Sequence, residues 1–194
     1  MLKNPQDRRA KRTAMQIKET MFSFMESKAI HEISVSEICK TCQINRATFY
    51  NHYRDVFDLV QDMEKDLLLT LEERMEQVLP EETPAEEVSR LFFHFLTEHK
   101  QKLCLLLTNE RSREFCIRLD TLLTPFFEKK VRQTYVIPEG QEVRLRQTME
   151  FVSTGYYRVF FQTLTDPLGN MTEQAELCVR LSDACLELLF EKKP

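Results

Sequence analysis

The chain has 194 residues, of which 42% are hydrophobic and 30% are charged; this apolar content is enough for a folded core and excludes an intrinsically disordered chain. It contains only three glycines, and because hairpin turns need glycine at positive φ while helices do not, the composition favours an all-α protein. The net charge of −4 is unevenly distributed along the chain. Residues 1–54 contain ten Lys and Arg against five Asp and Glu, a charge of +5, and the remaining residues carry −9. The first part of the chain is therefore predicted to bind a polyanion.

Features of export or of membrane insertion are not visible in the sequence. The first residues, MLKNPQDRRAKR, contain no apolar signal-peptide core, and the longest aliphatic run, LCLLL at 103–107, is far shorter than the roughly 20 residues of a membrane span. The six cysteines belong to a chain that is large enough to fold without disulfides, so reduced thiols are expected. We therefore expect a soluble, cytoplasmic protein with no membrane contact.

The N-terminal part has the pattern of three helices. Apolar residues recur with a helical period and predict the first helix over about 8–27. Ser34 is followed three residues later by Glu37, which is a capping box, so a second helix is expected to begin directly after Ser34. Asn45 offers another N-cap only a few residues later. Two short helices joined by a turn at residues 42–44 predict a helix-turn-helix.

The third helix carries side chains that suit DNA. If residues 46–53 are helical, Phe49 and Tyr53 lie at i, i+4 and point inward, and the opposite face points outward. Arg and Asn match the edges of guanine and adenine, and Ala allows close approach to a thymine methyl group. The predicted base-contacting residues are Arg46, Ala47, Tyr50 and Asn51. The predicted phosphate contacts are Ser34, Ser36, Thr48, Tyr50, His52 and Arg54. A helix face that is merely solvated would carry more Glu and Lys.

The remainder of the chain is predicted to be helical as well. Asp55 is the N-cap of a long helix whose apolar stripe ends before Pro80, and Pro125 interrupts a later one. The predicted helices cover about 56–79, 85–98, 101–108, 112–134, 140–164 and 172–191. Together with the first three, they give an all-α fold of about nine helices.

The stretch ISVSEICKTCQINRATFYNHYRDVFDLV at 33–60 resembles the DNA-binding module of the TetR/AcrR family of bacterial transcriptional regulators, and the similarity covers about residues 10–60. The residues that carry the match are Ser34, Ile38, Ile44, Thr48, Phe49, Tyr50, His52, Tyr53 and Leu59. The chain departs from the family pattern at Cys42, Gln43 and Val56, where relatives have Ala, Gly and Lys. Arg54 is the expected substitute for the phosphate contact of that Lys, and Gln43 is expected to adopt a left-handed conformation at a cost of about 1 kcal/mol.

The resemblance implies a one-component transcriptional regulator, a repressor that binds a palindromic site on double-stranded DNA as a homodimer and is released by an unknown small-molecule or protein effector. It implies a DNA-binding domain at 1–55 and a helical effector-binding and dimerisation domain at 56–194. The last two helices would form a four-helix bundle with a second subunit through Leu177, Leu181, Cys185 and Leu188, although this stripe also fits a monomer core. The spacing of TGYYRVFFQTL is similar to that of a subgroup that includes regulators near dihydroxyacetone kinases.

Aromatic residues of the second part are numerous enough to line an apolar effector pocket, or to form plain core. The predicted pocket residues are Phe92, Phe95, Phe126 and Tyr156.

For the other residues that could bind a metal or react, a structural role explains the sequence better than a chemical one. Cys39 and Cys42 form a CxxC, but no second pair completes a zinc site and both thiols are expected on the inward face. His94 and Glu98 lie at i, i+4 without a third ligand and are expected to be a polar pair near solvent. Because none of the common catalytic or phosphate-binding motifs occurs, no enzyme, cofactor or metal is predicted. The alternative function is a protein-interaction module or coactivator whose C-terminal domain binds a protein partner.

Overall fold

The computed structural model of the chain describes residues 5–77, 85–107, 112–165 and 171–193, and these residues form an all-α fold with one very short antiparallel ladder. The helices are α1 (Pro5–Met25), the 3₁₀ turn η1 (Ile30–Glu32), α2 (Val35–Thr41), α3 (Arg46–Tyr50), α4 (Val56–Gln77), α5 (Ala85–Glu98), α6 (Lys100–Leu107), α7 (Ser112–Thr134), α8 (Glu142–Thr165) and α9 (Met171–Glu187). The all-α fold with nine α-helices in the described residues confirms the fold class.

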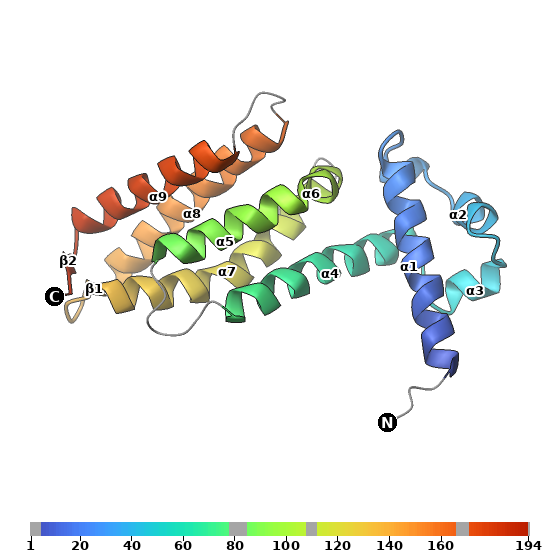
Figure 1. Cartoon of the computed structure of the whole chain (residues 1–194), viewed down its shortest axis with the longest axis horizontal. Coiled ribbons are helices and arrows are strands. Elements are labelled where there is room, and N and C mark those ends of the chain that lie inside the picture. The colour runs from blue at the N-terminus through green and yellow to red at the C-terminus, as the bar shows by residue number, and fades with distance from the viewer. Residues whose placement is uncertain (1–4, 78–84, 108–111, 166–170, 194) are drawn as a thin grey trace.

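Helices α1, α2 and α3 lie at one end of an elongated molecule, and α4 runs from them into a second group formed by α5 to α9 (Figure 1). The first group packs around side chains that are completely buried, among them Ile17, Met21, Ile38 and Phe49. Full burial of one such side chain contributes about 1.5–3 kcal/mol. The N-terminal module is therefore stabilised by the apolar faces of α1, α2 and α3, which are buried together.

Side-chain caps begin α2 and α3 where the sequence predicts them. The backbone N–H of Glu37 donates to Ser34 Oγ at 3.2 Å, and the N–H of Ser34 donates to Glu37 Oε2 at 3.0 Å, which completes the capping box. The N–H of Thr48 donates to Asn45 Oδ1 at 2.7 Å. These contacts satisfy backbone donors that have no partner within the helix, so both predicted helix starts are confirmed.

The turn between α2 and α3 is a Schellman motif. The N–H of Ile44 donates to the Cys39 carbonyl at 3.0 Å, and the N–H of Gln43 donates to the Lys40 carbonyl at 3.3 Å. This pattern requires the left-handed conformation at Gln43, whose φ is 54°. The predicted left-handed conformation is thereby confirmed, and the motif directs the chain sharply from α2 into α3.

Helix α4 is joined to the N-terminal module by charged contacts. Lys18 Nζ on α1 lies 2.7 Å from Asp62 Oδ2 and 2.6 Å from Asp66 Oδ2, and the Tyr53 hydroxyl donates to Asp62 Oδ2 at 3.1 Å. Although partial burial favours neutral Lys18, the two carboxylates raise its pKa. Burial and the Asp62 charge both raise the pKa of Tyr53, so its hydroxyl stays a hydrogen-bond donor. The first half of α4 is therefore bound to α1 through Lys18 and to the residues after α3 through Tyr53.

Farther along, α4 packs against α5 and α7, while α8 and α9 lie side by side at the far end of the second group (Figure 1). The carboxylate of Glu64, which is 1% exposed, forms an ion pair with the guanidinium of Arg118 on α7. Arg74 makes a bidentate pair with Glu98 on α5, at 2.7 and 3.1 Å. Helix α4 is thus bound both to the N-terminal module and to the second group.

The structure differs from the predicted elements at two helix ends. Helix α3 ends at Tyr50, not at residue 53, yet the N–H of Tyr53 still donates to the Phe49 carbonyl at 2.9 Å, which preserves the i, i+4 relation. Helix α9 ends at Glu187 because the following residues pair with the segment after α7.

That pairing forms a short ladder which the sequence did not predict. Strand β1 (Tyr135–Val136) lies antiparallel to β2 (Glu191–Lys192), and the N–H of Lys193 donates to the Thr134 carbonyl at 2.8 Å. The ladder closes the end of the second group over the buried Tyr135 side chain. None of the described helices is both long and apolar enough to cross a membrane.

Candidate nucleic-acid interface and effector cavity

The outer face of α3 lies open to solvent. All four residues predicted to contact bases are exposed, and Tyr50 keeps 52% of its surface accessible. The opposite face is buried through Phe49 and Tyr53, whose rings lie 5.8 Å apart. Tyr50 packs edge-on against Phe49 at 5.7 Å, which fixes the base of the ring and leaves its hydroxyl outward. The helix therefore presents a rigid polar surface on an apolar foundation.

Arg46 and Ser36 meet on this surface. The guanidinium Nη2 of Arg46 donates to Ser36 Oγ at 2.8 Å, so the bond joins the first turn of α3 to the first turn of α2. This contact is exposed and weak enough to be exchanged for a base edge or a phosphate oxygen. Arg46 is thus placed where α2 and α3 approach each other, with its planar group available for a bidentate contact.

Among the residues predicted to contact phosphates, some already make hydrogen bonds within the protein. The hydroxyl of Ser34 donates to Glu37 Oε2 at 2.8 Å, and the hydroxyl of Thr48 donates to Asn45 Oδ1 at 2.9 Å. The Ser34 hydroxyl is the cap of α2, and the Thr48 hydroxyl is bound to Asn45, the cap of α3; both can still accept a hydrogen bond, but their donated proton is committed. A phosphate oxygen needs a donor, so these two residues are weaker candidates than Ser36 and Tyr50.

Two further phosphate candidates lie beyond the end of α3. Arg54 is exposed and forms an i, i+4 ion pair with Asp58, its Nη2 lying 3.1 Å from Asp58 Oδ1. The carboxylate raises the pKa of Arg54, which is charged in any case. His52 is half-buried with its ring 6.0 Å from that of Tyr53. The contact of all these residues with DNA stays a prediction.

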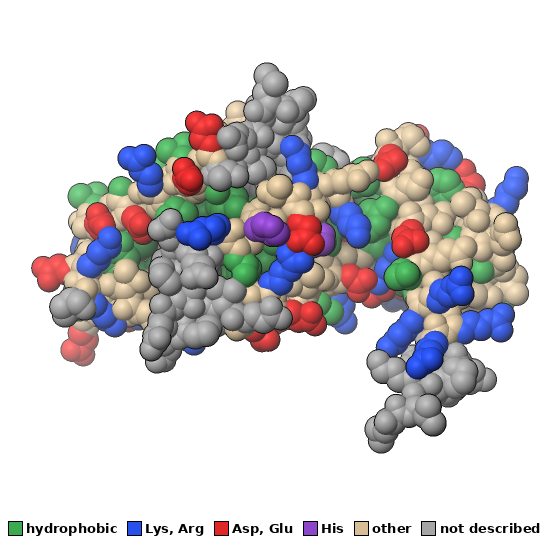
Figure 2. All heavy atoms as spheres, in the orientation of Figure 1, with side chains coloured by type: hydrophobic (Ala, Val, Ile, Leu, Met, Phe, Trp, Pro, Cys, Tyr) green, Lys and Arg blue, Asp and Glu red, His purple; other side chains and the backbone are tan. Residues whose placement is uncertain are grey.

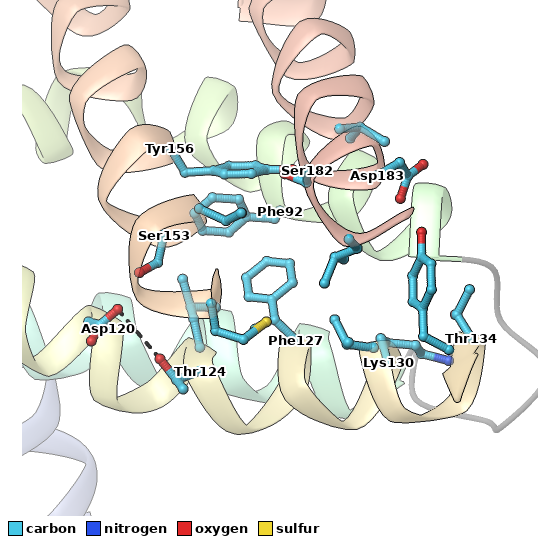
Figure 3. A pocket seen from close by; sticks show the side chains of 17 residues that line it. Phe92, Asp120, Thr124, Phe127, Lys130, Thr134, Ser153, Tyr156, Ser182 and Asp183 are labelled. Atoms are coloured by element: carbon cyan, nitrogen blue, oxygen red, sulfur yellow. Dashed lines mark hydrogen bonds between the residues drawn. The ribbon is translucent and has the colours of Figure 1, made fainter. Parts of the chain in front are cut away.

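A cavity lies in the second group of helices, between α5, α7, α8 and α9 (Figure 3). Its volume is about 90 Å³, roughly six times the space needed by a single water. The rings of Phe92, Phe127 and Tyr156 form its middle. Such a cavity suits a small organic molecule with an apolar body.

Polar groups gather at the two ends of this cavity. At one end lie Ser153, Asp120 and Thr124, the last two joined by a hydrogen bond of 3.4 Å (Figure 3). At the other end lie Lys130, which is 4% exposed, and Asp183. Aromatic walls with charged and hydroxyl groups at both ends can orient an amphipathic ligand.

Only part of the predicted pocket lines this cavity. Phe92 and Tyr156 do, whereas Phe95 and Phe126 are absent from its wall and Phe127 is present instead. One residue along a helix turns the side chain by about 100°, which moves Phe126 to another face, where it packs half-buried against the core. Phe95 points toward α4, where the guanidinium of Arg74 lies 5.6 Å from its ring centroid.

The polar lining could not be predicted from the sequence. Asp120 and Thr124 stand at i, i+4, but so do many solvent-exposed pairs, and Lys130 is one of several basic residues on its helix. What distinguishes Lys130 is burial by α8 and α9, which follow much later in the chain. The sequence around Lys130 therefore gives no indication that this side chain is buried.

An apolar face covers the outside of α8 and α9. Leu181 is 55% exposed and Leu188 83% exposed, Leu177 is also exposed, and Phe151 on α8 joins them. A groove between the two helices is lined by Phe151, Leu181 and the half-buried Cys185. The predicted dimer-interface residues therefore lie on one surface, although Cys178 and Leu186 on the same helix are buried in the monomer. Pairing through this surface stays a prediction.

The remaining candidates fit structural roles. Cys39 and Cys42 are buried, and the Cys42 thiol lies 3.1 Å from Thr20 Oγ1. Burial raises the pKa of Cys39, which disfavours the reactive thiolate. His94 Nδ1 lies 3.8 Å from Glu98 Oε2 at the surface. Within the residues that the structure describes, no group of three or more metal-ligating side chains comes together.

No protein-family model matches the sequence, and no curated protein is similar to it. Solved structures share its fold. DhaS, the activator of a dihydroxyacetone kinase operon, is 17% identical with a TM-score of 0.68, and the match covers 92% of this chain and 98% of DhaS. A TetR transcriptional regulator from Streptococcus agalactiae is 16% identical with a TM-score of 0.70, covering 96% and 98%. The TetR-family repressor AlkX from Dietzia sp., implicated in n-alkane biodegradation, is 14% identical with a TM-score of 0.52, covering 90% and 95%. The chain therefore has the fold of TetR-type regulators.

Proposed function

We propose that the chain is a one-component transcriptional regulator that binds a palindromic DNA operator as a homodimer. The observation that carries this proposal is the outer face of α3, where exposed Arg46, Tyr50 and Asn51 project from a helix held by buried Phe49. A helix of this kind fits the major groove, and its Arg and Asn suit guanine and adenine edges. The function is one of binding in the cytoplasm and involves no catalysis.

Residues 1–55 form the DNA-binding domain and residues 56–194 the effector-binding and dimerisation domain in this proposal. Support for the dimer comes from the exposed apolar face that contains Leu177, Leu181 and Leu188. Contiguous exposed apolar surface on a protein of this size marks an interaction site. A second copy is the natural occupant, because two recognition helices related by two-fold symmetry match a palindromic operator.

The effector in this proposal is a small molecule that occupies the cavity of α5, α7, α8 and α9. The aromatic rings would cover its apolar body, and Lys130 with Asp183 at one end and Asp120 with Thr124 at the other would bind its polar groups. No comparable argument from the described surface favours a protein effector. The ligand class is therefore small, amphipathic and polar at both ends.

Helix α7 links the cavity to the DNA-binding module. Its residues Asp120 and Thr124 line the cavity, and Arg118, less than one turn away, forms the ion pair with Glu64 of α4. Asp62 and Asp66, which flank Glu64 on α4, are joined to α1 through Lys18. A ligand that shifts α7 changes the angle of α4 and so the spacing of the two recognition helices in the dimer, which weakens operator binding.

The sign of regulation is proposed to be repression, as in the TetR-family repressor AlkX, while DhaS is an activator of the same fold. An operator that overlaps a promoter is blocked by the bound dimer. A promoter–reporter fusion in cells with and without the chain decides the sign: higher expression without the chain supports repression, and lower expression supports activation.

The DNA-binding proposal is tested by fluorescence anisotropy with duplexes from the region upstream of the chain's own coding sequence. Arg46→Ala is expected to weaken operator binding by about 1–3 kcal/mol and to relax the base preference. Tyr50→Phe, which removes only the hydroxyl, is expected to weaken binding to all sequences alike. Binding that is weak, unselective and indifferent to Arg46 would contradict the proposal and favour a protein-interaction module.

A further inference from the structure

The first turns of α1 carry a cluster of basic residues that the recognition-helix assignment does not use. Arg8, Arg9, Lys11 and Arg12 fall within five consecutive positions, and all four are exposed. Figure 2 shows Lys and Arg side chains gathered around this end of the N-terminal module, and in the sequence a single acidic residue, Asp7, stands beside the four basic ones. The cluster is therefore a strongly positive surface.

This cluster is electrostatically unfavourable in the isolated protein. Cations near a helix N-terminus oppose the helix dipole. Arg8 and Arg12 also stand at i, i+4, and Arg9 and Arg12 at i, i+3, where like charges repel. Within the described part of the chain, neither Arg9 nor Arg12 has an ion-pair partner. A polyanion bound here would remove this repulsion.

Two of the basic residues, Arg9 and Arg12, lie on the side of α1 that faces the helix-turn-helix. Gln16 Nε2 donates to the Cys42 carbonyl at 3.2 Å, so Gln16 marks the direction of the turn between α2 and α3. At about 100° per residue, Arg12 lies within about 40° of Gln16 around the helix axis and Arg9 within about 20°. At 1.5 Å per residue, they lie about 6 and about 10 Å farther toward the N-terminus.

The structure therefore places Arg9 and Arg12 on the extension of the surface that carries α3. In Figure 1, the N-terminal half of α1 and α3 occupy the same end of the module. We propose that this half of α1 is a second DNA-binding surface, in which Arg9 and Arg12, flanked by Arg8, contact phosphates next to the groove that α3 enters. This inference rests on the proposed operator-binding function.

Phosphates, not bases, are the expected ligands. Arginine binds a phosphate with charge-assisted and often bidentate hydrogen bonds. The residues lie beside the recognition helix and not on it, so they add affinity without reading sequence. Each phosphate that is neutralised releases condensed counterions, and the salt dependence of binding therefore counts such contacts.

The test compares Arg9→Gln/Arg12→Gln with the wild-type chain, using anisotropy titrations against operator and scrambled duplexes at several salt concentrations. The slope of log K against log salt is expected to fall by about 2 for each subunit, and so by about 4 for the bound dimer, with equal weakening for both duplexes. Arg113→Gln/Lys129→Gln removes two exposed charges from α7 and is the matched control, which is expected to leave the slope unchanged. Circular dichroism checks that the helices remain.

The possible outcomes separate this inference from the operator-binding proposal. A wild-type chain that selects its operator through Arg46, with the same salt slope in Arg9→Gln/Arg12→Gln, would overturn the second surface alone. Equal loss of slope in Arg113→Gln/Lys129→Gln would also overturn it, because the effect would then be general charge. If the wild type binds both duplexes equally but loses slope only in the α1 variant, the phosphate surface is supported and the operator proposal fails.

Discussion

Gln43 is, glycine apart, the only residue in the described ranges with a positive φ, and it occupies the turn that orients the recognition helix. A residue with a β-carbon costs about 1–2 kcal/mol in this conformation. Its side chain is exposed, so the strain is not offset by burial. The backbone bonds of the Schellman motif maintain it, because they satisfy the carbonyls at the end of α2.

Gln43→Gly is expected to raise the free energy of unfolding by about 0.5–1 kcal/mol. The removed strain exceeds the extra entropy that glycine gives to the unfolded chain. Urea unfolding followed by circular dichroism measures the change. Gln43→Ala keeps the β-carbon and should remain close to wild type, and a glycine variant less stable than the alanine variant would show that the turn is not strained.

Glu37 has a role in stability that depends on pH. A hydrogen bond from Lys28, followed by the backbone and side-chain hydrogen bonds of Ser34, lowers the pKa of Glu37 to about 2. A carboxyl group with a lowered pKa in the folded state stabilises the fold above its unfolded pKa, about 4.5, and that contribution disappears as the pH falls toward 2.

Glu37→Gln is therefore expected to lower the melting temperature at pH 7, with a difference from wild type that shrinks between about pH 4.5 and pH 2. Thermal melts at closely spaced pH values test this. The exposed Glu76 lies in the last turn of α4, so Glu76→Gln is the control. A difference that grows as the pH falls would contradict the assignment.

At the scale of the element, α4 is the part that joins the two groups of helices. It holds the N-terminal module through Asp62 and Asp66 and the second group through Glu64 and Arg74. Asp62, Glu64 and Asp66 lie within about one turn of each other on α4, so the contacts with α1 and with α7 are made by the same rigid segment of helix. In the proposed mechanism, α4 is therefore the element that transmits a displacement of α7 to α1.

The pair between Glu64 and Arg118 is the buried member of this set. Arg118→Met is expected to destabilise the fold by about 2–4 kcal/mol, because the buried carboxylate loses its guanidinium partner. Chemical denaturation measures the loss. Glu64→Leu/Arg118→Met removes the stranded charge as well and should recover most of the stability. If the double variant were as unstable as Arg118→Met, the loss would reflect packing of the Arg118 stem and not the charge.

At the scale of the whole molecule, the exposed apolar face on α8 and α9 is the surface through which the proposed dimer forms. Removing α9 would be a poor test of this face, since Cys178 and Leu186 on the same helix belong to the buried core. A substitution confined to the exposed side is sharper, because it leaves the monomer core intact.

Leu181→Glu, at a position 55% exposed, is expected to convert the dimer to a monomer while its circular dichroism spectrum stays helical. Sizing chromatography with light scattering measures the mass. Ile117→Glu changes a side chain of similar exposure on α7, 57%, and is expected to remain dimeric. A Leu181→Glu chain that still runs as a dimer would place the interface elsewhere.

Local chemistry determined the N-terminal module and the positions of most helices. The caps at Ser34 and Asn45 involve residues within a few positions of each other, so local sequence predicted them, and the resemblance to a family with Gly at the turn predicted the left-handed Gln43. The same holds for the exposed side of α3, because the spacing of Phe49 and Tyr53 fixes which face is buried. The predicted end of α3 was wrong, since no local signal stops the helix at Tyr50.

Only the tertiary structure decided the cavity between α5, α7, α8 and α9 and the connections of α4. The cavity is lined by residues from four helices. On α7, Phe127 lines the cavity and the neighbouring Phe126 does not, so the prediction missed the wall by one position. Apolar periodicity cannot predict how such a helix is rotated about its axis, because it has apolar residues on several sides. The burial of Lys130, the Glu64 to Arg118 pair and the ladder of Tyr135 with Lys192 each depend on segments far apart in the chain. The spacing of residues along a helix predicts contacts within that helix. Contacts between helices that are far apart in the sequence depend on how the helices pack against one another in the core.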